Sequence, residues 1–298
     1  MVIARVIADP AQNNSGLEAR LDAATAALGD QGISIAAVSM LHDARDVLQI
    51  MLPDAEIGGV SKVLSEVFAP CDLLLSEGDI AVPQLFVSDM DSTMIGQECI
   101  DELADYAGLK DRIAEITERA MQGELDFERA LRERVGLLAG LEESAIDRCL
   151  AERITPMEGA RKLVGTLKAK GCRTILVTGG FHHFADPIAE LLGFDRVVGN
   201  RLAVKDGKLT GQLLGAITDS SVKRRVLLDE LGELGEEAIS LATGDGANDI
   251  PMLEAATFGV AYHAKPKARE ASNGQINRGD LISVLKLFGI PETDWVIS

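Results

Sequence analysis

The 298-residue sequence contains few aromatic residues and few cations. Aromatics make up only 4% of a chain that is 47% hydrophobic, so its core must be built mainly from aliphatic side chains. This favours helices packed on aliphatic strands over an aromatic-rich all-β fold. Lys and Arg total 29 against 47 Asp and Glu, giving a formal charge of −18. Nucleic acids and anionic membranes are polyanions, so they are excluded as expected partners, and a small anionic substrate would need a local group of cations and amides.

Paired cysteines and export signals are also missing. The four cysteines are Cys71, Cys99, Cys149 and Cys172, and none forms a CxxC pair, which argues against zinc and favours reduced thiols. The N-terminus has no basic stretch followed by an apolar run, and nowhere do 18 apolar residues follow one another. We therefore expect a cytoplasmic protein.

Residues 1–82 read as a small α+β unit. The hydrophobic pattern predicts, in order, a strand, a helix, two strands, a helix and a strand, over residues 2–8, 17–28, 33–41, 47–52, 60–68 and 72–75. This order resembles the ACT-like modules with a ferredoxin-like layout. No Asp-x-x-Gly ligand loop follows the first strand, so the unit is expected to serve regulation, packing or dimerisation, with a homodimer formed through it.

Residues 83–298 read as a second, larger domain that begins at Pro83. The short apolar strand 85–88 is followed by an amphipathic helical stretch over about 98–155, and strands then alternate with helices again. The later strands are expected at 174–177, 239–243 and 258–262, with a hairpin over 197–212 turning at Asp206-Gly207. The pattern predicts a doubly wound, Rossmann-like α/β core with a helical cap inserted after its first strand. In such sheets the site lies beyond the carboxyl ends of the strands.

Three polar motifs follow predicted strands. Asp89 and Asp91, after strand 85–88, could divide nucleophilic attack and proton transfer between them, although Asp-x-Asp is usually a solvated turn. Asp245 and Asp249 offer the oxygen ligands that Mg²⁺ prefers, although a Gly/Asn/Asp-rich loop without a ligand fits as well. Thr178, followed by two glycines, could cradle phosphate or form a plain tight turn. Three such motifs at equivalent strand ends indicate one site.

Two cations stand where a structural rule disfavours them. Lys223 falls in the first turn of a helix that Ser220 and Ser221 could cap, where the helix dipole disfavours a cation by about 0.3–1 kcal/mol. Arg134 projects between Phe127 and Leu131, on the apolar side of its helix, so it needs an anionic partner. That partner is either a structural carboxylate or a substrate carboxylate held bidentately.

Together these motifs resemble the haloacid-dehalogenase-like (HAD) phosphatases, in particular those that act on phosphoserine. The resemblance runs from about Gln84 to the C-terminus. It is carried by DMDSTM and DELA around Asp89, FERALRERVGLL around Arg134, TGGF at Thr178, NRL-x-VKDGKLTG at 200–211, and GDGANDIPML at Asp245.

The resemblance implies hydrolysis of O-phosphoserine, the last step of serine biosynthesis, with these residue roles. Asp89 would be the nucleophile and Asp91 the general acid and base, with Lys223 neutralising charge. Mg²⁺ would be held by Asp89, the Asp91 carbonyl and Asp245, supported by Asp249. Substrate would be bound by Thr178, Gly179 and Asn248 at phosphate, Glu98 at ammonium and Arg134 at carboxylate, and shielded by Met121 and Phe127.

One position departs from the family pattern, because Thr178 stands where a serine is usual. The hydroxyl survives, so activity is expected to be retained, although the added methyl stiffens χ1. Two other functions fit the sequence. The chain could act on another small phosphomonoester or transfer phosphate to an acceptor such as homoserine. It could also be a receiver or amino-acid sensor with Asp89 as phosphate acceptor, although receivers lack the second Asp and the helical insertion.

Overall fold

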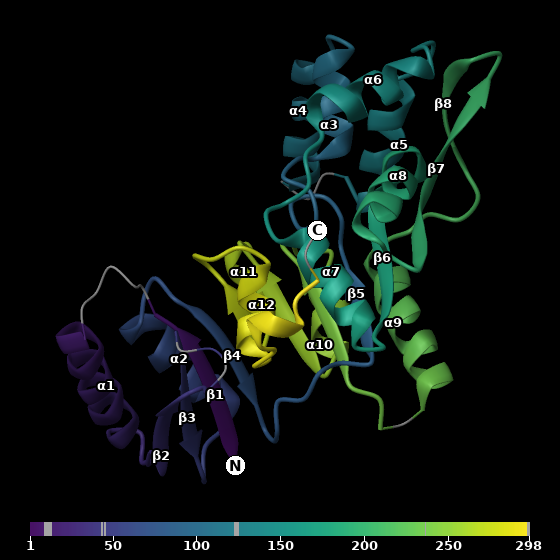
Figure 1. The fold of residues 1–298 in the computed structure, drawn as a ribbon. Helices are drawn as coiled ribbons and strands as arrows, with labels where there is room; N and C mark the ends of the chain where they lie inside the picture. The colour runs from purple at the N-terminus through teal and green to yellow at the C-terminus, as the bar shows by residue number, and fades with distance from the viewer. Residues whose placement is uncertain (9–13, 43, 45, 122–124, 236, 297–298) are drawn as a thin grey trace.

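The computed structural model describes residues 1–8, 14–42, 44, 46–121, 125–235 and 237–296. A single eleven-stranded sheet runs through the molecule, in the order β2-β3-β1-β4-β11-β10-β9-β5-β6-β7-β8. Figure 1 shows the N-terminal elements at one end of this sheet, and the elements of the predicted cap standing above the other end. In the described part of the chain, no helix combines the length and the hydropathy that a membrane crossing would require.

The N-terminal part is an antiparallel sheet covered on one face by two helices. Its elements are β1 (Val2–Ile7), α1 (Asn14–Gly29), β2 (Ala37–Met40), β3 (Val47–Leu52), α2 (Ile57–Val67) and β4 (Asp72–Ser76). Alternate residues of β1, such as Val2, Ala4 and Val6, are buried against the apolar stripes of α1 and α2. The helix predicted at 17–28 lies within α1 and the strand predicted at 47–52 is β3, whereas β2 is shorter than the predicted strand 33–41.

The larger part is a doubly wound parallel sheet. Its strands are β5 (Leu85–Ser88), β6 (Arg173–Phe181), β7 (Arg196–Lys205), β9 (Ser240–Gly244), β10 (Phe258–Tyr262) and β11 (Gly274–Ile276). Helices α7 (Ala160–Ala169), α8 (His182–Leu192) and α12 (Ile282–Leu287) pack on one face, and α9 (Ser220–Leu234), α10 (Ile250–Ala255) and α11 (Pro266–Glu270) on the other. Successive side chains of β5 point to opposite faces of the sheet, which explains this arrangement. Phe86 packs in the core on the side of α7, α8 and α12, whereas Leu85 and Val87 pack in the core on the side of α9, α10 and α11.

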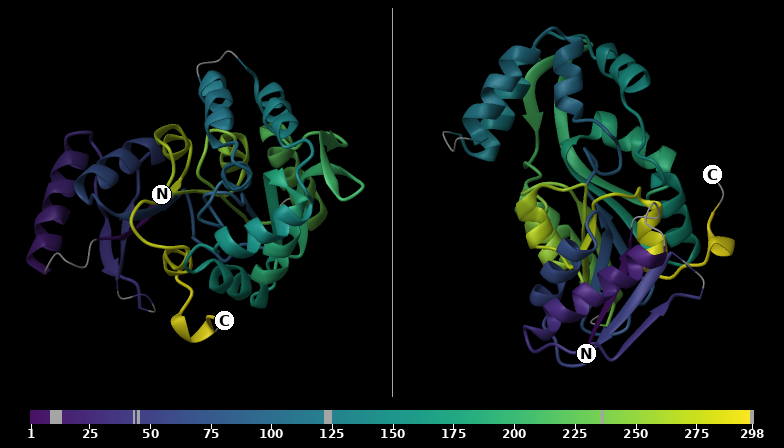
Figure 2. Two further views of the ribbon diagram at one scale, coloured as in Figure 1. Left: turned by 90° about the horizontal axis from the view of Figure 1, so that it is seen from above. Right: turned by 90° about the vertical axis from the view of Figure 1, so that its left-hand side faces the viewer.

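Four helices follow β5 and rise beyond the carboxyl end of the sheet (Figures 1 and 2). They are α3 (Cys99–Tyr106), α4 (Lys110–Met121), α5 (Phe127–Leu137) and α6 (Ser144–Arg153). The hairpin of β7 and β8 (Lys208–Leu214) supports them. The amide of Gly140, after α5, donates to the carbonyl of Leu209, whose own amide donates to the carbonyl of Leu141. The hairpin turns at Asp206 and Gly207, both with positive φ, as the sequence predicted.

The two parts of the chain share the sheet, a feature that the sequence did not reveal. Strand β4 pairs with β11 in antiparallel register. At this seam the buried carboxylate of Asp72 accepts hydrogen bonds from the backbone amides of Asn277, Arg278 and Gly279 and from the hydroxyl of Ser283. Four donors compensate the cost of burying the carboxylate, so the seam is a fixed structural junction.

Two local predictions were wrong. The N-cap of α9 is Asp219, whose side chain accepts from the amide of Val222, and not Ser220 or Ser221. Strand β6 continues through Thr178 to Phe181 with an irregular register, so the Thr-Gly-Gly motif lies within the strand and not in a strand-to-helix turn. The motif lies between Val177 and Phe181, the two residues on either side of it that pair with β7.

Candidate active site

The carboxyl ends of β5, β6 and β9 deliver acidic and hydroxyl groups to one cavity of about 290 Å³ beneath α4 and α5. The described residues bring nine of the predicted side chains or backbone groups to its wall: Asp89, Asp91, Glu98, Phe127, Arg134, Thr178, Gly179, Asp245 and Asn248. Lys223 and Asp249 do not line the cavity and lie beneath it. Met121 ends α4, and its side chain lies outside the described part of the structure.

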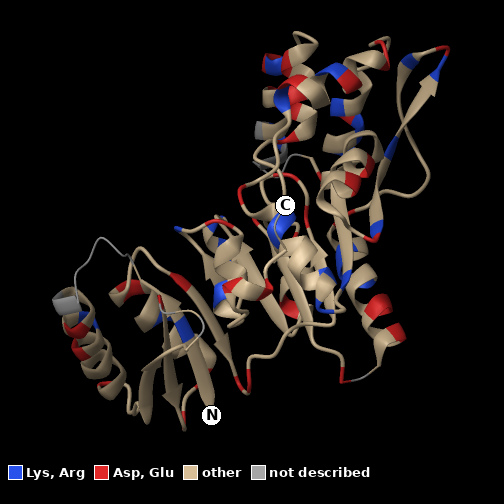
Figure 3. Ribbon diagram, in the orientation of Figure 1, with Lys and Arg blue, Asp and Glu red and all other residues tan. Residues whose placement is uncertain are grey.

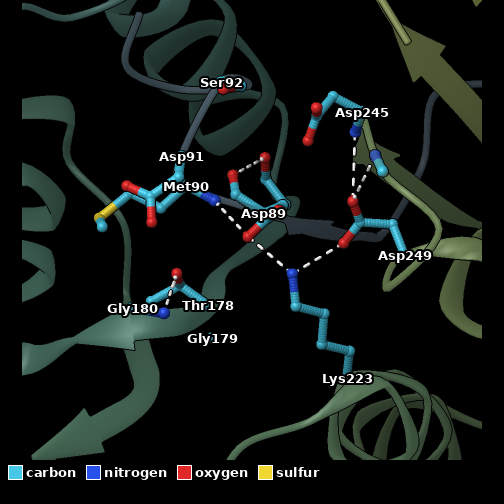
Figure 4. A network of polar contacts seen from close by, with 12 residues as sticks. Asp89, Met90, Asp91, Ser92, Thr178, Gly179, Gly180, Lys223, Asp245 and Asp249 are labelled. Carbon is cyan, nitrogen blue, oxygen red and sulfur yellow. Dashed lines mark hydrogen bonds and ion pairs between the residues drawn. The ribbon is translucent and has the colours of Figure 1, made fainter. Parts of the chain in front are cut away.

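Asp89 is the centre of a buried ionic network. Its Oδ1 lies 2.7 Å from the ammonium of Lys223, which lies 2.7 Å from Oδ1 of Asp249 (Figure 4). Lys223 is 1% exposed, which confirms that this cation points inward, while Arg224 and Arg225 are exposed. One lysine between two carboxylates leaves a net negative charge in an apolar setting. An additional cation above Asp89 would therefore be favoured.

The pKa of Asp89 also favours a cation beside this carboxylate. Burial and the neighbouring Asp249 raise the pKa of Asp89 well above its ordinary value, although Lys223 opposes this. Burial alone would lower the pKa of Lys223, but its two carboxylate partners together raise it, so the ammonium stays charged. A cation bound at the free oxygen of Asp89 would favour the ionised, nucleophilic form.

The described residues include a carboxylate cluster that fits a divalent cation. Oxygens of Asp89, Asp245 and Asp249 lie within 4.8 Å of one another. The Asp249 carboxylate is already occupied, because Oδ1 pairs with Lys223 and Oδ2 accepts from the amides of Asp245 and Gly246. Burial and Asp249 raise the pKa of Asp245 to about 6. Hard carboxylate oxygens suit Mg²⁺, with Asp249 holding the loop.

Asp91 faces the opposite wall of the cavity. Burial and Glu98 raise its pKa to about 7, while the amide of Cys99 donates to its Oδ1 at 3.3 Å. A Cβ built on Gly180 would lie 3.0 Å from the other carboxylate oxygen, so glycine lets this strand approach closely without displacing the carboxylate. A carboxyl group that titrates near neutrality can both give and accept a proton.

The hydroxyl of Thr178 is buried and accepts from the amide of Gly180 at 2.8 Å. Its methyl group packs against Gly199 on the neighbouring strand. Asn200, 2% exposed, donates to the carbonyl of Gly179 and accepts from the amide of Thr218. Asn200 thus holds the Thr-Gly-Gly segment in place. Its role was missed because it depends on the pairing of β6 with β7.

The wall formed by α3, α4 and α5 is more open. Glu98 is exposed and accepts a hydrogen bond from Ser92, whose φ is +54°. Arg134 is half-buried, which lowers its pKa, while the negative charges of Asp101 and Glu98 oppose this. Among the described residues no ion pair satisfies its guanidinium, and Nε donates only a long 3.4 Å bond to Ala130. Within the described part of the chain, Arg134 therefore has no structural carboxylate paired with it, which was one of the two predicted partners.

The aromatic ring of Phe127 closes one side of the cavity. Its Cζ lies 3.3 Å from where a Cβ on Gly179 would stand, so the ring touches the Thr-Gly-Gly segment across the cavity. The wall also contains residues that the sequence did not suggest, including Ile100, Asp101, Thr117 and Lys265. Asp101 begins the DELA motif but had no predicted role, the other three belong to no predicted motif, and the place of all four depends on how the helices pack.

Comparisons with known proteins identify relatives of this chain. Residues 86–254 match the family model of the haloacid dehalogenase-like hydrolases. A phosphoserine phosphatase from Albidiferax ferrireducens is 44% identical over 211 residues, covering 69% of this chain and 89% of that protein. A HAD family hydrolase from Salmonella enterica serovar Typhi superposes with a TM-score of 0.83 at 28% identity, covering 97% and 99% of the two chains. A probable phosphoserine phosphatase from Vibrio cholerae gives a TM-score of 0.74 at 31% identity, covering 98% and 87%.

Proposed function

The chain belongs to the haloacid dehalogenase-like hydrolase family, and we propose that it hydrolyses O-phosphoserine to serine and phosphate through a phosphoryl group carried on Asp89. The observation that carries the proposal is the composition of one cavity. Its floor offers the Asp89 and Asp91 pair, and its cap side offers Glu98 and Arg134, which match an ammonium and a carboxylate. A phosphorylated amino acid has a phosphate for the floor of the cavity, and an ammonium and a carboxylate for its cap side.

The first half of the reaction forms the phospho-enzyme. A carboxylate oxygen of Asp89 attacks phosphorus, and the bond from phosphorus to the serine oxygen breaks. Asp91, protonated near neutral pH, gives its proton to the leaving oxygen, so serine departs as a neutral alcohol. In the second half Asp91 takes a proton from water as that water attacks phosphorus. Phosphate is released and Asp89 is regenerated.

Charge neutralisation is the main task of the remaining residues, because an anionic carboxylate must approach an anionic phosphate. Lys223 offsets charge on Asp89 from beneath. We assign the phosphate oxygens to Thr178, the amide of Gly179 and Asn248. A bound Mg²⁺ would supply further positive charge at the phosphoryl group, held by Asp89, the carbonyl of Asp91 and Asp245, while Asp249 supports the loop.

The helical cap, about residues 98–155, would supply recognition and exclude water. Glu98 accepts from the substrate ammonium. Arg134, which lacks an ion-pair partner among the described residues, binds the carboxylate. Phe127 already touches the Thr-Gly-Gly segment and, with Met121, would shield the reacting groups.

A substrate panel with and without Mg²⁺ tests the proposal by measuring released phosphate. We expect kcat/KM for phosphoserine to exceed that for phosphoglycolate, which has no ammonium, and that for phosphohomoserine, which is one methylene longer. Equal values for phosphoserine and phosphoglycolate would contradict the roles of Glu98 and Arg134. A stable phospho-Asp89 with negligible phosphate release would instead favour a receiver.

For residues 1–82 we propose an ACT-like domain that regulates or dimerises the enzyme, next to a phosphatase domain of residues 83–298. The antiparallel order β2-β3-β1-β4 with both helices on one face supports the ferredoxin-like layout. The edge strand β2 exposes Val38 and Met40, and it could pair with a second copy. Sedimentation of the wild type against Val38→Lys tests this homodimer.

The four free, buried thiols support a cytoplasmic location.

A further inference from the structure

The charges on the cavity wall are unequal. Its carboxylates belong to Asp89, Asp91, Glu98, Asp101 and Asp245, and its cations to Arg134 and Lys265. The buried Lys223 does not redress the balance, since two carboxylates already surround it. Acidic residues are also spread over every part of the fold (Figure 3). A phosphate dianion that enters from solvent therefore meets a predominantly negative wall, and each cation there has a large influence.

Lys265 lies at the phosphate end of this cavity. It stands between β10 and α11, and its amide donates to the carbonyl of Asp245 at 3.0 Å. Its own carbonyl accepts from the amides of Ala268 and Arg269, which fixes its main chain. The cation of Arg134 comes from α5, where Asp101 and Glu98 are its acidic neighbours. The two cations thus belong to different ends of the same cavity.

The side chain of Lys265 is available for an anion. It is exposed, and the ion pairs and side-chain hydrogen bonds found among the described residues include none from its ammonium, whose acidic neighbour is the carboxylate of Asp245. By contrast, Lys170, Lys208 and Lys286 each pair with a carboxylate within 3.0 Å. A flexible ammonium beside a carboxylate-rich loop can reach a phosphoryl oxygen without any rearrangement of the backbone.

We propose that Lys265 is a further phosphate-binding residue, which contacts the phosphoryl group of the substrate and the released phosphate from the solvent side of the cavity. The inference rests on the proposed function insofar as the substrate is a phosphomonoester, whatever its alcohol. Lys223 stabilises the charge on Asp89 from within, and Lys265 attracts and holds the phosphate from outside. Its main effects should fall on KM and on phosphate affinity, with a smaller effect on kcat.

The test uses the full chain with Mg²⁺ and the variants Lys265→Met, Lys265→Gln and Lys265→Arg. Lys267→Met is the matched control, since Lys267 is an exposed lysine of the same helix that does not line the cavity. Calorimetric titration gives the Kd of inorganic phosphate, and steady-state assays give kcat and KM over a range of KCl concentrations. Thermal melting checks the fold of each variant.

Lys265→Met and Lys265→Gln should raise the phosphate Kd and the KM by about tenfold, the size expected of a partly exposed, charge-assisted contact. Lys265→Arg should restore most of the loss, and Lys267→Met should behave as wild type. The KM ratio between Lys265→Met and wild type should shrink as KCl rises, because salt screens the contact. A change in packing would not produce this dependence.

The proposal is overturned if both neutral Lys265 variants match Lys267→Met in phosphate Kd and KM. It is also overturned if a loss in KM does not change with KCl. A different result would contradict the proposed substrate and not the role of Lys265. If phosphoserine is not hydrolysed but the phosphate Kd still changes when Lys265 is substituted, the substrate assignment is wrong and the role of Lys265 stands.

Discussion

The two ends of the cavity are built differently. At the core end, Asp89, Lys223, Asp249 and Thr178 are at most 4% exposed, and each polar group has a partner in the chain. At the cap end, Glu98 is exposed, Arg134 lacks an ion pair among the described residues, and Phe127 is 41% exposed. With the roles proposed above, the catalytic groups are therefore organised before the substrate arrives, whereas the recognition groups gain their partners only when the substrate binds.

This difference has a physical reason. Groups that stabilise a transition state act best when they need no reorganisation, and burial strengthens their electrostatic effect. Groups that recognise a zwitterion must admit it from water, so they keep their hydration until it binds. We expect changes at the core end to reduce turnover, and changes at the cap end to reduce affinity.

The largest effect should come from Asp89→Asn. The amide keeps the shape of the side chain but cannot attack phosphorus, and in a well-studied protease loss of the nucleophile costs about 10⁶ in kcat. We expect phosphate release to fall by at least about 10⁴-fold, with substrate binding largely retained. Rapid-quench assays for phospho-enzyme and calorimetric binding of phosphoserine would measure the two effects. Residual turnover above one per cent of wild type would break the comparison, because the core end would then not depend on Asp89.

A smaller loss is expected at the cap end, from Arg134→Ala. Losing a charge-assisted bond to the substrate carboxylate costs about 1.5–3 kcal/mol, or roughly 10- to 100-fold in KM. The activity on a phosphomonoester without a carboxylate should hardly change. Arg132→Ala is the matched control, because Arg132 lies on the same helix, is exposed and pairs with Glu128. An equal loss for both substrates would mean that Arg134 supports the fold and not recognition.

The strands of the sheet differ in how far the sequence predicts them. Strands β3, β5 and β10 have the predicted bounds, because each is an aliphatic run buried in the sheet. Strand β11 could not be predicted, since Gly274–Ile276 carries no apolar pattern and gains its place by pairing with β10 and with β4, some 200 residues earlier in the chain.

Within the site, Asp89, Asp91 and Asp245 could be predicted because the carboxyl ends of parallel strands meet at one edge of the sheet. Lys223 and Arg134 were found because each breaks a local rule for placing charge. Asn200, Asp101 and Lys265 break no such rule for placing charge, so the sequence analysis assigned them no role. Asn200 reaches Gly179 through the pairing of β6 with β7, and Asp101 and Lys265 reach the cavity wall through the packing of the helices.

The carboxylates at the core end predict how pH and metal affect stability. Asp91 and Asp245 have folded pKa values of about 7 and about 6, above the unfolded values, so the folded state binds more protons between about pH 4 and pH 7. Metal-free protein should therefore lose stability as pH rises through this range. The proposed Mg²⁺ would bind the ionised cluster and should restore the lost stability above this pH range.

Melting curves in EDTA and in Mg²⁺ would measure this. The gain in Tm from Mg²⁺ should be larger by about 3 °C or more at about pH 8 than at about pH 5. Asp245→Asn should remove most of that difference. A gain that is the same at both pH values would place the bound cation away from the buried carboxylates.

The smallest effect should come from Thr178→Ser, at the point where this chain departs from its family pattern. The hydroxyl that accepts from Gly180 is retained, so kcat and KM should change by less than about threefold. The methyl packs against Gly199, and its loss should lower the free energy of unfolding by about 0.5–1.5 kcal/mol, as for other buried methyl deletions. Urea unfolding alongside kinetics would separate the two. A stability loss without a kinetic one would mean that the methyl serves packing alone, whereas a large change in kcat would mean that it helps to aim the hydroxyl at phosphate.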